Sequence, residues 1–339
     1  MKKTIILCIG VLFLAGQVFA GVIKKTNSKV TFKGFGTFTS IQTEKISSDK
    51  KRTDSENSFK GKGLLGGMAA KMVLRPGEIG EIINLEEMMI YQMDHKKKEY
   101  EVNQITKMTE EREEEKEISE EEPEEEIKSR DIKIIRSEFR VDETGNQKVI
   151  NQFPCKEYVM TWITEWEDLS SGEKGTDRLS TIIWTTPYVD EVKSAHEEEM
   201  KFSQEYMKRL GIDMDEVQQE ILGTNWLSVF RGLSQAERGP MEDVSRYGEE
   251  MKKVEGYPVV IDGKYFASRE GQKEEEEKEE ETKSVKGVFG KLAKKALTKK
   301  SKDVEEEPAF AYYIELIEFS PSTVSETEFG IPAEYKKKG

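Results

Sequence analysis

The chain has 339 residues, of which 35% are hydrophobic and 35% charged, and its 53 Lys and Arg against 67 Asp and Glu give a formal net charge of −14. This acid excess disfavours nucleic-acid binding, because nucleic-acid binders displace counterions with clustered Lys and Arg. With only two Cys and two His, multi-Cys zinc modules, iron–sulfur clusters and disulfide scaffolds are excluded.

The beginning of the chain has the pattern of a cleaved secretory signal. A basic start at residues 2–3 precedes an apolar stretch at residues 5–14 and the sequence Val-Phe-Ala at residues 18–20. This predicts residues 1–20 as a signal peptide and a periplasmic or secreted mature protein. Cys8 lacks the small neighbours of a lipoprotein cleavage site, and no later apolar run approaches the roughly 20 residues of a membrane helix. We therefore expect neither a lipid anchor nor a transmembrane helix.

Two charged segments interrupt the mature chain. An acidic insertion occupies about residues 106–129, and a charged linker followed by a Lys-rich amphipathic helix occupies about residues 272–307. Runs of like charge cannot bury enough apolar surface to offset roughly 1–2 kcal/mol of backbone entropy per residue. We therefore expect residues 21–339 to form a single domain from which two solvated insertions project.

The first ordered part of the chain reads as strands. Apolar residues alternate with Thr and Lys over residues 30–38, and three further runs at residues 79–85, 89–93 and 100–102 are joined by polar turns. Short strands separated by turn residues are typical of antiparallel hairpins.

The second ordered part begins in the same way. A strand over residues 132–141 is followed by a predicted turn at 142–147, a long strand from 148 to 166 and another strand at 179–186 that Pro187 ends. Side chains alternate with period two, so one face of the long strand carries a large apolar set. The set consists of Tyr158, Met160, Trp162, Thr164 and Trp166.

From Val189 the apolar spacing changes to the helical period, and residues 189–254 are predicted to form two or three helices. Residues 259–266, with a tight turn at Asp262-Gly263, and residues 310–319 return to strand composition. This order predicts an α+β fold, in which a curved antiparallel sheet packs against a helical block.

The motifs resemble those of a family of secreted bacterial proteins of unassigned function. The segment from Phe329 to Lys336, Phe-Gly-Ile-Pro-Ala-Glu-Tyr-Lys, resembles the closing motif of that family, although Glu334 stands where Gly is usual. The Gly-Leu-Leu-Gly-Gly segment at residues 63–67 and the phrase around Phe153-Pro154-Cys155 are similar to further family motifs. The family pattern is in turn similar to the periplasmic lipoprotein carriers. The resemblance implies a curved sheet wrapped around helices, with an apolar cavity for acyl chains.

The sequence matches two motifs of known sites, but neither match has the neighbouring residues that such a site requires. Residues 61–66 match G-x-G-x-x-G but follow a polar, Lys-rich segment instead of a buried strand. His196 begins an H-E-x-x pattern in which Met200 replaces the second zinc ligand, and a site built from His196 and His95 would have to be assembled across the fold. We expect a non-catalytic protein with no cofactor and no metal.

Large flexible and aromatic side chains in the strands are candidates for a ligand pocket, because Met adapts to varied guests. The candidates are Met89, Met93, Met160, Trp162 and Trp184. They predict a binding protein for a lipid or another apolar molecule, although ordinary core packing explains the same residues.

The Lys-rich helix supports an alternative function. Its apolar stripe and neighbouring charges are represented by Val285, Val288, Phe289, Leu292, Lys294 and Lys295. Such a helix can lie on an anionic membrane surface or on an envelope protein, which would make the chain an envelope-associated interaction protein. The other interpretation is intramolecular, with the stripe docked on the sheet and the adjacent Glu residues neutralising the Lys residues.

Overall fold

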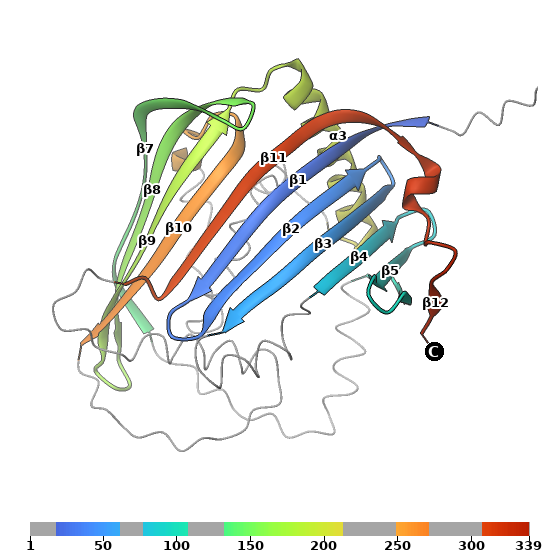
Figure 1. Ribbon diagram of the computed structural model, residues 1–339. Helices are drawn as coiled ribbons and strands as arrows, with labels where there is room; N and C mark the ends of the chain where they lie inside the picture. Colours follow the sequence, from blue (N-terminus) through green and yellow to red (C-terminus); the bar gives the residue numbers. More distant parts are fainter. Residues whose placement is uncertain (1–17, 62–76, 108–131, 213–248, 271–306, 339) are drawn as a thin grey trace, which may run out of the picture.

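The computed structural model describes residues 18–61, 77–107, 132–212, 249–270 and 307–338, and one sheet of twelve strands contains most of them (Figure 1). In spatial order the strands are β12-β6-β5-β4-β3-β2-β1-β11-β10-β9-β8-β7, and every neighbouring pair is antiparallel except β12 and β6. The strands are β1 (Val18–Phe32), β2 (Gly36–Ile46), β3 (Lys50–Gly61), β4 (Gly77–Asn84), β5 (Met89–Asp94), β6 (Glu99–Gln104), β7 (Ile132–Ile150), β8 (Phe153–Asp168), β9 (Lys174–Thr186), β10 (Tyr257–Glu270), β11 (Phe310–Ser325) and β12 (Lys336–Lys337).

The sheet consists of two runs of sequential strands joined by a strand from the end of the chain. Strands β1 to β6 form one run and β7 to β10 the other, and β11 pairs with β1 on one side and with β10 on the other. Three tight hairpin turns use a non-glycine residue at positive φ, namely Met88, Lys98 and Asn151. Positive φ is characteristic of the tight turns that connect antiparallel strands.

Helix α3 (Asp190–Arg209) lies across one face of the sheet, over β11, β1 and β2 (Figure 1). Acidic residues in its first turn and basic residues in its last turn complement the helix dipole. Val192, Ala195 and Phe202 are buried against the sheet. The face of the sheet that α3 contacts is called the inner face below.

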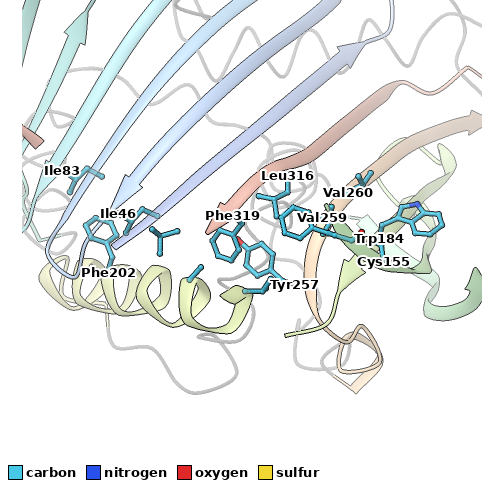
Figure 2. Packing of buried hydrophobic residues seen from close by; sticks show 14 of the residues in the cluster. Ile46, Ile83, Cys155, Trp184, Phe202, Tyr257, Val259, Val260, Leu316 and Phe319 are labelled. Atoms are coloured by element: carbon cyan, nitrogen blue, oxygen red, sulfur yellow. The ribbon is translucent and has the colours of Figure 1, made fainter. Parts of the chain in front are cut away.

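Two hydrophobic clusters hold the fold together. The first lies beneath α3, and Figure 2 shows Phe202 of the helix beside Ile46 of β2, and Tyr257 beside Phe319 of β11. The rings of Tyr257 and Phe319 stack with centroids 4.3 Å apart. The second cluster is built from β7 to β11 and from the end of β1. Together they extend the buried apolar surface across most of the width of the sheet.

The predicted fold class, an α+β fold with a helical block, is wrong. One large sheet dominates the described residues, whose helical elements with defined bounds are α3 and the 3-10 helix η1 (Glu326–Phe329). Of the predicted helical region at 189–254, α3 accounts for the first third, and residues 213–248 lie outside the described residues. The helical periodicity was therefore correct for one helix, but the strands on both sides of it join in a single sheet instead of flanking a helical layer.

Most predicted strands are confirmed, but two predicted turns are wrong. Residues 142–147 lie within β7, where a bulge between Glu143 and Gln147 absorbs the turn-forming residues, and the chain reverses later, at Asn151. Asp262-Gly263 lies inside β10, where Gly263 has a packing role described below. The acidic insertion lies almost wholly outside the described residues, as does the charged linker with its Lys-rich helix.

Candidate functional site

The inner face carries a continuous apolar surface that runs across six strands from β1 to β7. Backbone pairing aligns its side chains in rows perpendicular to the strands. One row consists of Phe32, Phe310, Tyr265, Leu179, Trp162 and Phe139, and the next of Val30, Tyr312, Gly263, Thr181, Met160 and Val141. A third row contributes Ile314, Ile261, Ile183 and Tyr158. These three rows are called the apolar floor.

The apolar floor lies on the same face as α3. Val30 and Phe32 alternate along β1 in phase with Lys24, whose ammonium group contacts Glu199 of α3. Side chains at every second position of a strand share one face. The helix therefore covers one end of a surface that continues beyond it.

Large aromatic rings lie flat on this face because glycines stand beneath them. A Cβ atom at Gly263 would come within 2.1 Å of Tyr312 Cζ, and one at Gly175 within 2.4 Å of Trp166 Cζ2. The Tyr312 hydroxyl reaches across Gly263 to Thr181, with the two oxygen atoms 3.0 Å apart. Rings that lie along the sheet occupy less height above it than rings that stand upright, so these glycines keep the floor shallow.

A polar network closes one end of the floor. Asp177 is 6% exposed and accepts hydrogen bonds from Trp166 Nε1 at 2.9 Å and from the Tyr265 hydroxyl at 2.8 Å. Arg269 lies beside Trp166, with its guanidinium carbon 5.5 Å from the ring centroid. The carboxylate is thus paired, and this end of the floor is fixed in position.

The described residues cover the floor only in part. Met251 and Val254, just before β10, pack against it, and the Glu250 carboxylate accepts a hydrogen bond of 3.0 Å from the backbone N–H of Val141. Several floor side chains remain partly exposed. They are Val30, Phe32, Phe139, Trp162, Tyr265 and Ile314. The partly exposed members include both edges of the floor, on β1 and β7, and side chains on β8, β10 and β11 between these edges.

A buried ion pair holds α3 against the sheet beside the floor. Lys24 Nζ of β1 donates to Glu199 Oε1 at 2.5 Å, and the Tyr257 hydroxyl donates to Glu199 Oε2 at 2.9 Å. The side chains of Lys24 and Glu199 are each 17% exposed. His196 Nδ1 lies 3.8 Å from Glu199 Oε2, so the imidazole flanks the pair without reaching hydrogen-bond distance.

The charges of this pair reinforce each other. Burial by itself raises the pKa of Glu199, but the positive charge of Lys24 and the hydrogen bonds from Lys24 and Tyr257 outweigh it and hold that pKa well below its usual range. Burial lowers the pKa of Lys24, and the nearby Glu199, Tyr257 and Glu44 raise it well above its usual value. Both groups are therefore charged at neutral pH.

The predicted pocket residues are only partly brought together. Met160 and Trp162 lie on the apolar floor, whereas Trp184 belongs to the cluster beneath α3 and has Lys148 Nζ 3.9 Å from its ring centroid. Met89 and Met93 lie on β5, which seven strands separate from β8. The six residues of the Lys-rich helix, Val285 to Lys295, lie outside the described residues.

Sequence analysis missed the aromatic members of the floor on β10 and β11. Phe310, Tyr312 and Ile314 stand at every second position of β11, so their common face could be read from the period of two. Their pairing with Tyr265, Gly263 and the end of β1 depends on the register between distant strands. The sequence therefore indicated the strand itself, but it did not indicate which strands lie beside it or in which register.

The two His residues lie apart and have different partners. His95 Nε2 is 3.0 Å from Asp54 Oδ1, and His95 Nδ1 is 2.7 Å from the hydroxyl of Tyr335. His196 lies on α3 between the rings of Tyr188 and Tyr257. Tyr335 belongs to the closing motif, which is therefore attached to the sheet through His95. Among the described residues, no group of three or more His, Cys, Asp or Glu side chains is placed to hold a metal ion.

Comparisons with protein-family models, with curated proteins and with solved structures gave no match to this chain. Of the helices in the described part of the chain, none has the length and apolar character needed to cross a membrane.

Proposed function

We propose that the protein is a non-catalytic binding protein that holds an elongated apolar ligand, such as the acyl chain of a lipid, against the apolar floor. The observation that supports this proposal is a surface whose paired rows are almost entirely apolar across six strands, with a buried centre and six partly exposed side chains. Contiguous apolar patches on a protein mark sites of interaction, because covering them removes unfavourable contact with water.

The shape of the floor supports an extended ligand. Tyr312 and Trp166 lie flat over Gly263 and Gly175, so the surface offers a shallow bed instead of interlocking side chains. Met160 and Trp162 give it adaptable and polarizable contacts, which suit a chain of methylene groups. Each buried methylene group contributes about 0.8 kcal/mol, so a chain of ten contributes about 8 kcal/mol, from which the cost of association is subtracted.

We also propose a periplasmic or secreted location, which the signal-like residues 1–20 support. Cleavage after Ala20 would shorten β1, which begins at Val18, to residues 21–32. The remaining strand keeps the Lys24 ion pair and all its floor residues, so the expected mature protein retains the complete site.

Binding of diphenylhexatriene, which fluoresces when it enters an apolar environment, tests this proposal directly. We expect the purified protein to bind the probe, and we expect Val30→Glu to reduce the affinity at least about 10-fold, because a carboxylate in the floor opposes apolar contact. Val149→Glu is the matched control, since Val149 is 70% exposed on β7.

Contact with the floor is tested independently by fluorescence quenching. Acyl chains that carry bromine should quench Trp162, and the Trp162→Phe variant should lose the part of the quenched signal that Trp162 supplies. Trp166 lies on the same face but is only 2% exposed, and Trp184 is not on the floor. Native mass spectrometry and lipid extraction of the purified protein would identify any ligand that is retained. Protein that binds no probe and carries no extractable lipid would rule the function out.

A further inference from the structure

Part of the inner face changes character where it passes from β1 to β2 and β3, while the second row of the floor stays apolar there through Phe38 and Phe59. The third row of the floor continues across these strands through Ser28, Ser40 and Asn57, in which Ser40 pairs with Ser28 on one side and with Asn57 on the other. The neighbouring row carries Thr26, Gln42 and Ser55 in the same orientation. The apolar floor therefore borders on an uncharged polar surface of these six side chains, which is called the polar bed below.

Two buried atoms of the polar bed have no hydrogen-bond partner. Ser40 is 2% exposed and its hydroxyl oxygen is unpaired, and the amide oxygen of Asn57, on the adjacent strand, is buried and unpaired as well. A buried polar atom without a partner costs about 1–3 kcal/mol, and native structures rarely tolerate one. Two such atoms at directly paired positions on one face indicate that a bound molecule supplies their hydrogen-bond partners.

The chemistry of these atoms restricts the molecule that would bind. An amide oxygen only accepts hydrogen bonds, so its partner must donate, which a carboxylate or a fully ionised phosphate cannot do. The six side chains of the polar bed carry no charge. The nearest charges on the same face of β1 and β2 are Lys24 and Glu44, which already pair with Glu199 and Lys51. An anionic head group would therefore lack a partner.

We propose that the ligand is a neutral amphiphile with a hydroxyl-bearing head group, such as an acyl ester of a polyol, whose head binds Ser40 and Asn57 and whose chain crosses the apolar floor. This inference rests on the proposed function. It adds the chemical class of the ligand and the orientation of its head group and chain on the sheet. The chain crosses Ile314, Ile261 and Ile183, on successive strands about 4.8 Å apart.

One feature at the far end of the same row provides a test of the direction. Tyr158 on β8 is 1% exposed and its hydroxyl also lacks a partner. It is a single hydroxyl next to Met160 and Ile183 in the second hydrophobic cluster, whereas the polar bed offers six uncharged polar side chains. The head group is therefore assigned to the polar bed, and removal of the Tyr158 hydroxyl is the matched control.

The experiment measures displacement of diphenylhexatriene by 1-monodecanoylglycerol and by decanoate at pH 8, in the wild type and in Ser40→Ala, Asn57→Ala and Tyr158→Phe. For the wild type, we expect the glyceride to bind at least about 10-fold more tightly than decanoate. The Ser40→Ala and Asn57→Ala variants should each bind the glyceride about 5- to 10-fold more weakly, which corresponds to the loss of one hydrogen bond. Ser40→Ala and Asn57→Ala should bind diphenylhexatriene as the wild type does, because neither residue belongs to the apolar floor.

A further readout separates binding from folding. Because the Ser40 hydroxyl is unpaired in the ligand-free protein, Ser40→Ala should not lower the midpoint of urea unfolding. Thr39→Ala, at the neighbouring position on the opposite face, should leave glyceride affinity unchanged. Glyceride affinity that is unchanged in Ser40→Ala and Asn57→Ala, or reduced only in Tyr158→Phe, would overturn the head-group assignment while leaving the apolar site in place. Failure to bind diphenylhexatriene would remove the proposed function itself, and this inference with it.

Discussion

Replacing Lys24 with Met should destabilise the protein strongly, because it leaves Glu199 charged and partly desolvated beneath α3. The Lys24 ammonium group is the one cation in hydrogen-bond contact with Glu199 among the described residues, and the Tyr257 hydroxyl remains as the other donor. Met has a similar length and apolar stem, so the substitution removes the charge with little change of volume.

The size of the effect follows from the burial of the pair. Removal of one partner of a fully buried ion pair costs about 3–5 kcal/mol. Both side chains here are 17% exposed, so water relieves part of the cost, and we expect a loss of about 2–4 kcal/mol. With a urea dependence of about 3 kcal/mol per molar for a protein of this size, the unfolding midpoint should fall by roughly 1 M.

The assay is urea unfolding followed by far-ultraviolet circular dichroism, together with hydrogen exchange of the amides of α3. Lys201→Met is the control, because Lys201 pairs with Glu198 on the same helix but is 58% exposed, and its loss should leave the midpoint unchanged. The double variant Lys24→Met/Glu199→Leu should recover most of the lost stability, since replacing both charges removes the unpaired one. Equal effects of Lys24→Met and Lys201→Met would refute the reasoning.

Three further predictions concern other features of the site. As pH falls below about 4.5, Glu199 becomes protonated in the unfolded chain before it does in the folded protein, where its pKa is lowered. In urea titrations, the stability advantage of the wild type over Glu199→Gln should therefore be full at pH 7 and smaller at pH 3. Gly263→Ala should cost about 2–3 kcal/mol in the same assay because the new methyl group meets the ring of Tyr312, and Tyr312→Leu in the same chain should restore part of it. Burial raises the pKa of Cys155 to about 11, so its reaction with a disulfide reagent at pH 8 should be roughly 200-fold slower in the folded protein than in guanidinium; equal rates would refute this.

The local structure of many strands could be predicted from the sequence. The alternation over Tyr158 to Trp166 correctly placed five side chains on one face, and Pro187 correctly ended β9. The turn-forming residues at 142–147 and at Asp262-Gly263 were wrongly predicted to be turns. Residues of the same types also occur at a β-bulge, as in β7, and beneath a large side chain that packs on the backbone, as Tyr312 does on Gly263.

The candidate site could be predicted only in part, because it depends on register between distant strands. Met160 and Trp162 were recognised as lining candidates, but nothing local indicates that Val30 lies in the row of Met160, since the pairing passes through β11, β10 and β9. The unpaired Ser40 and Asn57 are likewise ordinary polar residues in the sequence. Their significance lies in what surrounds them, which only the assembled sheet defines.

The position of β11 governs when the protein can complete its sheet. This strand separates β1 from β10, and about 280 residues of chain precede it after the end of β1, the first strand of the described residues. Pairing between such distant segments requires closure of a very long loop, which slows folding. A growing chain therefore holds two incomplete sheets with open edges until β11 emerges. During that interval it depends on whatever machinery shields nascent strands from aggregation.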